Sequence, residues 1–211
     1  MPRFAAALAV ALGMSAESVA QDRYAVERAR MVDEIAAIAR QTGSETGRAV
    51  FSERTMAAMR KVPRHRFVPA TGAVSAYDNR PLSIGEGQTI SQPYIVALMT
   101  ELLDAKPGDA VLEVGTGSGY QAAVLGEIAA KVYTIEIVDS LGRKAAEILG
   151  SLGYKNVITR IGDGYNGWKE YAPFDGIMVT AAPAEVPQMM GKGLRFLSGN
   201  ISAMAARTPT W

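Results

Sequence analysis

Apolar residues recur with helical spacing in the N-terminal half of the chain. Between Arg23 and Arg40 they fall at offsets 0, 7, 11 and 14, which places them on one face of a helix. This face comprises Tyr24, Met31, Ile35 and Ile38. A second, shorter helix is expected after Ser52 and before Pro63, where the chain meets a proline.

A third helix is predicted from Pro93 to Asp104. Counted from Ile95, apolar residues stand at offsets 0, 3, 4, 7 and 8, a full match to an amphipathic helix. Pro93 suits the first turn, where a missing N–H has no cost. The preceding stretch, Pro63 to Gln92, is rich in proline and glycine and is expected to be an ordered but irregular loop.

The pattern changes after Pro107 and Gly108, where short apolar runs alternate with helical segments. Such alternation predicts βαβ units and a parallel sheet covered on both faces. The expected strands are Ala110–Val114, Val132–Ile137, Val157–Ile161 and Gly176–Thr180, and the expected helices are Gln121–Ala130 and Ser140–Leu152. The fold class is therefore α/β, a doubly wound, Rossmann-like sheet preceded by N-terminal helices.

Residues 1–20 have the pattern of a secretory signal peptide. Arg3 gives a positive start, Phe4 to Met14 is apolar, and Ser18 to Ala20 offers a small-x-small cleavage site. The apolar run is too short to span a bilayer, which takes about 20 residues. An Ala-rich N-terminal helix is the alternative interpretation.

Composition excludes several kinds of function. A length of 211 residues fits one domain, and 22 basic against 21 acidic residues give a net charge of +1 without a basic run, so we expect no nucleic-acid partner. The absence of cysteine rules out disulfides, thiolate zinc sites and a cysteine nucleophile. With His65 as its single histidine, the chain has no multi-histidine metal centre, and we expect no metal.

The glycine-rich stretch after the first expected strand carries the most information. Gly115, Gly117 and Gly119 follow Glu113 in the spacing [DE]xGxGxG, whereas the dinucleotide fingerprint GxGxxG would need a glycine in place of Tyr120. This spacing is typical of S-adenosylmethionine-dependent methyltransferases. That cofactor carries cationic sulfonium and ammonium groups, so acidic neighbours such as Glu113 suit it better than a bare phosphate site. A tight strand-to-helix turn without a ligand is the simpler interpretation.

Two further acidic residues are placed where a nucleoside could bind. Glu136 ends the second strand, 21 residues after Gly115, where a carboxylate can accept hydrogen bonds from ribose hydroxyls. Asp163 and Gly164 follow the third strand, and the Asp163 carboxylate could face the adenine amino group. Asp163 is equally compatible with an ordinary Asp-Gly turn.

With these residues assembled, the chain resembles the protein-L-isoaspartate O-methyltransferase family. The resemblance runs from about Arg23 to Pro187 and is most specific at the segment GQTISQPY, Gly87 to Tyr94. The other matching segments are VPRHRFVP from Val62 to Pro69, Val111 to Tyr120, Gly162 to Trp168, Phe174-Asp175, and Thr180 to Pro183.

The resemblance implies methyl transfer from S-adenosylmethionine to the α-carboxylate of L-isoaspartyl residues in damaged proteins, a repair reaction. The alternatives are another S-adenosylmethionine-dependent methyltransferase and a catalytically silent, truncated remnant. It assigns the catalytic position to Ser91, substrate binding to Gln88, Thr89 and Ile90, and cofactor binding to the residues named above. From spacing alone, Ser91 is instead a helix N-cap two residues before Pro93. A carboxylate is already ionised at neutral pH, so the reaction needs alignment rather than a strong base.

The role of the charged loop around His65 has more than one interpretation. We expect His65 to be a packing or solvated residue without a catalytic role. Arg64 and Arg66 either attract carboxylates or form a solvated charged loop.

Organisation and location follow from the two ends of the sequence. We expect a signal-like segment at 1–20, a methyltransferase domain at 21–187 and an atypical tail at 188–211, which lacks the family's Lys-Pro-Gly-Gly turn. The sheet is therefore expected to be C-terminally incomplete, with Gly176–Thr180 as an exposed edge that promotes self-association; a complete fold would be a monomer. The family and its cytosolic cofactor imply the cytoplasm, with the periplasm as the alternative if residues 1–20 direct export.

Overall fold

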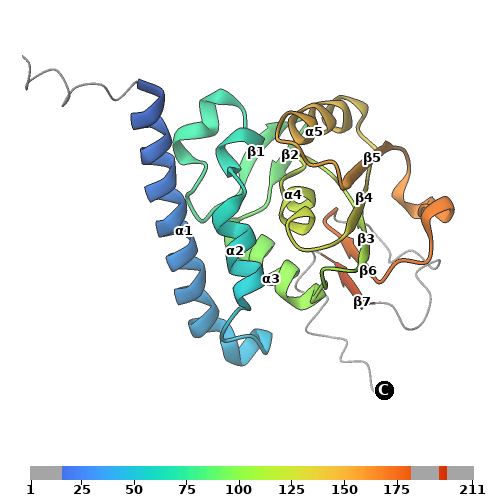
Figure 1. The fold of residues 1–211 in the computed structure, drawn as a ribbon, viewed down its shortest axis with the longest axis horizontal. Coiled ribbons are helices and arrows are strands. Elements are labelled where there is room, and N and C mark those ends of the chain that lie inside the picture. Colours follow the sequence, from blue (N-terminus) through green and yellow to red (C-terminus); the bar gives the residue numbers. More distant parts are fainter. Residues whose placement is uncertain (1–15, 182–194, 199–211) are drawn as a thin grey trace, which may run out of the picture.

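The computed structural model describes residues 16–181 and 195–198. Helices and strands alternate in the C-terminal half, after a largely helical N-terminal region (Figure 1). The helices are α1 Ala16–Thr46, α2 Glu53–Lys61, α3 Pro93–Leu103, α4 Tyr120–Gly126 and α5 Asp139–Ser151. The strands are β1 Leu82–Gly85, β2 Gln88–Ile90, β3 Ala110–Val114, β4 Lys131–Glu136, β5 Val157–Ile161, β6 Gly176–Val179 and β7 Arg195–Ser198. Among the described residues, no helix has the length and apolar character needed to cross a membrane.

The central sheet has the strand order β5-β4-β3-β6-β7, and every pairing in it is parallel. The order reverses between β3 and β6, which are adjacent although far apart in sequence. Ligands of doubly wound sheets bind at such a switch point, beyond the carboxyl ends of the strands. The fold class predicted from the alternating pattern is confirmed.

Side chains of the sheet alternate between two apolar layers. Val111, Val132 and Met178 pack toward α3, α4 and α5, while Leu112 and Ile177 face the opposite side. There they meet an aromatic group made of Tyr133, Trp168, Tyr171 and Phe174. Burial on both faces explains why β6 is apolar and buried at every position.

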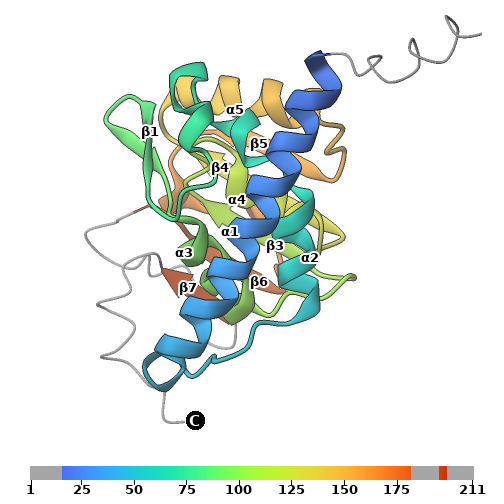
Figure 2. The same cartoon turned by 90° about the vertical axis from the view of Figure 1, so that its left-hand side faces the viewer.

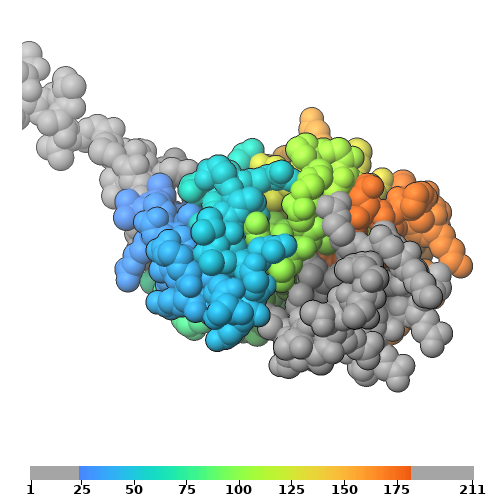
Figure 3. Space-filling model, turned by 90° about the horizontal axis from the view of Figure 1, so that it is seen from below, coloured from blue at the N-terminus to red at the C-terminus, as the bar shows by residue number. Residues whose placement is uncertain are grey.

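The N-terminal helices form one flank of the molecule. Helix α1 runs along α2 and α3 (Figure 2), and in the space-filling view from below this blue and cyan region lies at the opposite end from the orange segment (Figure 3). Helix α1 extends past its predicted end at Arg40 to Thr46, where Gly47 takes a positive φ of 70°. Helix α1 begins at Ala16 and continues without a break through Ala20, the expected cleavage position. Residues 1–15 lie outside the described residues.

The stretch Pro63–Gln92 is more regular than its proline and glycine content predicts. It contains the 3-10 helices η1 Arg64–Phe67 and η2 Ala70–Ser75, followed by the antiparallel hairpin of β1 and β2. The hairpin turns at Glu86, whose φ is positive, between Gly85 and Gly87. Leu82 and Ile84 alternate with exposed neighbours, a strand pattern too short to be noticed in the sequence.

The expectation of an exposed edge at Gly176–Thr180 is wrong. Strand β7 pairs in parallel with β6 along its outer side, with Gly176 opposite Arg195 and Val179 opposite Ser198. β6 is therefore an internal strand with hydrogen-bonded neighbours on both sides, which removes the basis for the predicted self-association. The rest of the tail from 182 onward lies outside the described residues.

Candidate functional site

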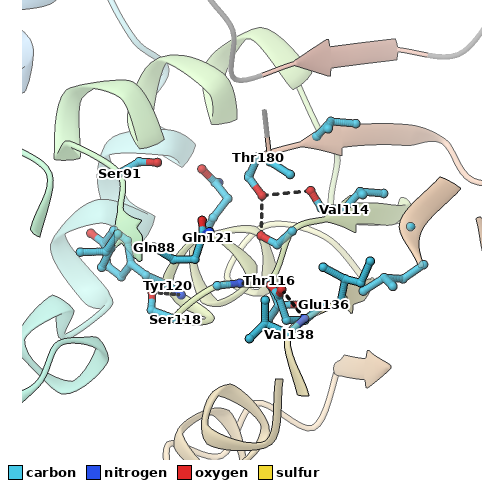
Figure 4. A pocket seen from close by; sticks show the side chains of 18 of the residues that line it. Gln88, Ser91, Val114, Thr116, Ser118, Tyr120, Gln121, Glu136, Val138 and Thr180 are labelled. Atoms are coloured by element: carbon cyan, nitrogen blue, oxygen red, sulfur yellow. Dashed lines mark hydrogen bonds between the residues drawn. The ribbon is translucent and has the colours of Figure 1, made fainter. Parts of the chain in front are cut away.

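A cavity of about 390 Å³ opens at the carboxyl edge of the sheet, at the switch point between β3 and β6. Its walls come from β2 with Ser91, the end of β3 with the following turn and the start of α4, the end of β4, the turn after β5 and the end of β6. Figure 4 shows side chains from these elements facing one space, with Ser91 across from Thr180 and Gln121. Five segments distant in sequence therefore converge on one site.

The three glycines of the first turn have different structural roles. A Cβ on Gly115, whose φ is +104°, would lie 2.7 Å from Thr180 Oγ1 and 2.8 Å from the Ala181 amide. Gly117 has a φ of +53° and lines the cavity. Gly119 does not line it: this residue is the N-cap of α4, and a Cβ there would press on α5 at Leu149, 3.2 Å away. The first two glycines shape the pocket, while the third permits close helix packing.

Glu136 lies in the pocket wall, held by two backbone amides. Its Oε2 accepts a hydrogen bond of 2.7 Å from the Gly117 N–H, and its Oε1 accepts one of 3.0 Å from the Val138 N–H. The side chain is largely buried, so these donors hold the carboxylate in one orientation beside the cavity.

Asp163 and Gly164 also line the cavity. Asp163 Oδ1 accepts a 2.9 Å hydrogen bond from the Tyr165 N–H, so the residue does form the Asp-Gly turn that its sequence context suggests. That turn and a place in the pocket wall coexist, and Oδ2 takes no part in the turn. Gly164 is sterically required, because a Cβ there would lie 2.2 Å from Val114 Cγ1.

Glu113 is not brought into the cavity. Its side chain is completely buried, with Oε2 accepting a 2.6 Å hydrogen bond from Thr134 Oγ1. Burial raises the pKa of Glu113 to about 8, so the group is mostly uncharged at neutral pH. It therefore cannot act as the anionic neighbour that its position in the motif suggests. A chain of hydroxyls still connects it to the cavity wall, since Thr134 Oγ1 lies 2.6 Å from Thr116 Oγ1.

Ser91 lines the cavity and does not cap α3. The N-cap position is Gln92, and its side chain makes no capping hydrogen bond. Instead, Asn79 Oδ1 accepts a 3.0 Å hydrogen bond from the Tyr94 N–H at the start of that helix. The Ser91 hydroxyl is thus directed to the pocket (Figure 4). Gln88, Thr89 and Ile90 of β2 line the same side, with Ile90 buried.

Several lining residues were not assigned a site role from the sequence. Gln121 donates from Nε2 to Thr100 Oγ1 at 2.9 Å, and Thr180 Oγ1 donates to the Val114 carbonyl at 3.1 Å. Ile137 and Tyr165 place exposed apolar surface at the cavity, 69% and 46% accessible. Both follow the end of a strand, and Tyr165 lies in one of the segments that resemble the family, two features that could have indicated them.

The loop around His65 is packed rather than solvated. His65 stacks on Tyr24 with ring centres 3.9 Å apart, and its Nδ1 lies 2.8 Å from the Tyr77 hydroxyl, as expected for a packing histidine. Arg66 is exposed, but Arg64 is fully buried, so the solvated interpretation fails for this residue.

Three features define this fold and site as those of a Rossmann-like methyltransferase. They are the parallel sheet with its switch point, the glycine turn that lacks a dinucleotide fingerprint, and the acidic residue Glu136 at the end of β4. Comparison with known proteins narrows this class. The profile of the family described as protein-L-isoaspartate(D-aspartate) O-methyltransferase (PCMT) matches residues 41–196, which carries the likeness past Pro187. The chain belongs to this family.

Individual relatives agree. The chain is 54% identical over 195 residues to protein-L-isoaspartate O-methyltransferase 1 of Cupriavidus necator, covering 92% of this chain and 75% of that one. It is 58% identical over 165 residues to protein-L-isoaspartate O-methyltransferase 2 of a Polaromonas species, covering 78% of each.

Solved structures support the fold. A protein-L-isoaspartate O-methyltransferase superposes with a TM-score of 0.62 at 30% identity, over 74% of this chain and 50% of that chain. A putative enzyme of this name from Plasmodium falciparum, in complex with S-adenosyl-L-homocysteine, gives a TM-score of 0.57 at 24% identity, over 71% of this chain and 75% of that chain. The second match bears on the fold alone.

Proposed function

We propose that this protein transfers the methyl group of S-adenosylmethionine to the α-carboxylate of L-isoaspartyl residues in damaged proteins. The single observation that carries the proposal is the position of Ser91: its hydroxyl faces the cavity while Asn79 caps the helix in its place. A hydroxyl released from capping can orient a substrate carboxylate against the cofactor pocket. Membership of the family supplies the reaction.

The pocket suits the proposed cofactor. Its volume of about 390 Å³ lies in the range of small-molecule sites. The Glu136 carboxylate retains acceptor capacity for ribose hydroxyls beyond its two amide donors. Asp163 Oδ2 is suited to accept from the adenine amino group, and Ile137 and Tyr165 offer apolar surface to the base.

The chemistry requires little from the protein beyond binding and alignment. S-adenosylmethionine supplies an electrophilic methyl group, which forms a C–O bond with the substrate while the C–S electron pair stays on sulfur. The attacking carboxylate is ionised near neutral pH, so no general base is required. Ser91 would donate a hydrogen bond that orients the carboxylate, and Gln88, Thr89 and Ile90 would hold the peptide beside it. The resulting methyl ester can close to a succinimide, whose hydrolysis partly restores aspartate.

A labelled-methyl assay tests this function. The purified protein is incubated with methyl-labelled S-adenosylmethionine and an isoaspartyl peptide, with the aspartyl peptide of the same sequence as control. We expect label in the isoaspartyl peptide alone, released as methanol by mild base because the product is an ester. Base-stable label would indicate another methyl acceptor, and cofactor binding without transfer would indicate an inactive protein.

The compartment and assembly belong to the same proposal. We propose a cytoplasmic monomer, because the cofactor is made in the cytosol and β6 is covered by β7. Mass spectrometry of the protein from its native cells should find residues 1–20 attached, and light scattering should give the mass of one chain. Cleavage after Ala20 would instead favour export.

A further inference from the structure

Arg64 lies directly behind the segment that carries Ser91. Its guanidinium is fully buried, with Nη2 donating to the Ser91 carbonyl and Nε donating to the Ala76 carbonyl, both at 2.7 Å. The guanidinium carbon stands 4.8 Å from the centre of the Tyr120 ring, at the start of α4. One side chain thus joins the substrate-side segment to the first turn of the helix that follows the glycine motif.

The charge of this guanidinium is not neutralised by an acid. Within residues 24–181, Arg64 forms no salt bridge, and its buried Nη1 has no hydrogen-bond partner. Burial lowers the pKa of the Arg64 guanidinium, and the groups that oppose this are the phenols of Tyr120 and Tyr77, whose own pKa values burial raises. An arginine keeps its proton in proteins, so a buried positive charge remains. Burial of a charge without an ionic partner is costly and calls for a reason.

We propose that Arg64 is a positioning residue for the substrate: it fixes Ser91 through its carbonyl, and its buried charge favours the substrate carboxylate that binds at the Ser91 hydroxyl. The proposal rests on the proposed isoaspartyl activity. A fixed positive charge behind a partly desolvated site attracts an anion more strongly than it would in water. The anionic substrate then supplies the counter-charge that the protein lacks.

The test compares two peptides that differ only in charge. One carries an isoaspartyl residue, and its twin carries isoasparagine, in which the α-carboxylate is a neutral carboxamide. Binding of each to the protein loaded with S-adenosylhomocysteine is measured by calorimetry. The unmodified protein should bind the isoaspartyl peptide at least about tenfold more tightly than the twin.

Three variants separate the effect of the Arg64 charge from its structural support of the Ser91 segment. In Arg64→Gln the preference for the isoaspartyl peptide should fall by about tenfold, while the affinity for the cofactor product stays the same. Arg64→Lys keeps the charge and should retain most of the preference, even if both peptides bind less tightly. The matched control Arg66→Gln removes an exposed cation two residues away and should leave both affinities unchanged.

The outcomes distinguish a failure of the role proposed for Arg64 from a failure of the proposed methyltransferase function. Equal weakening of both peptides in Arg64→Gln would mean that the arginine merely braces the loop, and the inference would fail. It would also fail if the unmodified protein bound the isoaspartyl and isoasparagine peptides equally. That measurement does not depend on whether any variant folds. If the unmodified protein methylates no isoaspartyl peptide, the proposed function itself is overturned.

Discussion

The backbone N–H of Gly117 donates a 2.7 Å hydrogen bond to the Glu136 carboxylate, linking the turn after β3 to the end of β4. Gly117 has a φ of +53°, which brings its amide to face the neighbouring strand. The acidic residue therefore orders the glycine turn in addition to lining the cavity. Both residues of this pair can be tested separately.

Glu136→Gln should weaken cofactor binding. A glutamine can accept from only one of the two backbone amides, because its NH₂ group would face the other donor. Hydrogen bonds to charged groups contribute about 1.5–3 kcal/mol, so we expect the dissociation constant for S-adenosylmethionine to rise by about 10- to 100-fold. Calorimetry measures this. Glu147→Gln, at an exposed position of α5, is the control and should bind as the unmodified protein does.

Gly117→Val should abolish cofactor binding, because a β-branched side chain at a positive φ distorts a turn that lines the cavity. Gly153→Val is a matched control: Gly153 has a φ of +81° with open space around it and lies away from this cavity. The control should lose comparable stability but still bind S-adenosylmethionine. Tight binding of NAD by the unmodified protein would contradict the assignment of the site.

Ser91→Ala should lower kcat/KM for an isoaspartyl peptide by about 10- to 100-fold, the loss of a hydrogen bond to a charged group. Its melting temperature and cofactor affinity should stay nearly unchanged, because the hydroxyl is not the cap of α3. Asn79→Ala is the complementary variant, expected to cost about 0.5–2 kcal/mol of stability through the unbonded Tyr94 amide. Normal turnover in Ser91→Ala would remove Ser91 from the reaction.

Much of the fold could be predicted because its elements have strong periodic patterns. The strands Ala110–Val114 and Val157–Ile161 were predicted with their observed bounds, since both are short segments rich in β-branched and apolar residues that alternate with helices. The helix predicted at Gln121–Ala130 ends earlier, at Gly126. Ile128 and Ala129 are buried in the turn that follows, so they continue the apolar pattern without continuing the helix.

The site was harder to predict, because sequence spacing does not reveal side-chain direction. Glu113 belongs to the expected motif, yet strand pleating turns it away from the cavity into the core, on the face shared with Thr134. The burial of Arg64 and the pairing of β7 depend on contacts between residues far apart in sequence. No local pattern carries that information.

The buried carboxyl of Glu113 predicts a stability that depends on pH. Its pKa is about 8 in the folded protein, against an ordinary value of 4.5. Below pH 4.5 the group is protonated in both states and its contribution is complete. Between pH 4.5 and 8 the unfolded chain releases the proton while the folded chain retains it, so the free energy of unfolding falls as the pH rises.

Glu113→Gln should remove this dependence, since the amide keeps an acceptor for Thr134 Oγ1 but does not titrate. Each pKa unit corresponds to about 1.4 kcal/mol, so the variant should gain a few kcal/mol relative to the unmodified protein between pH 5 and pH 8. Urea unfolding at several pH values measures the difference. Glu147→Gln, the exposed control on α5, should follow the unmodified protein throughout. If the free energy of unfolding varied with pH in the same way for Glu113→Gln and the unmodified protein, Glu113 would have the same pKa in the folded and the unfolded chain. Its burial would then not raise its pKa.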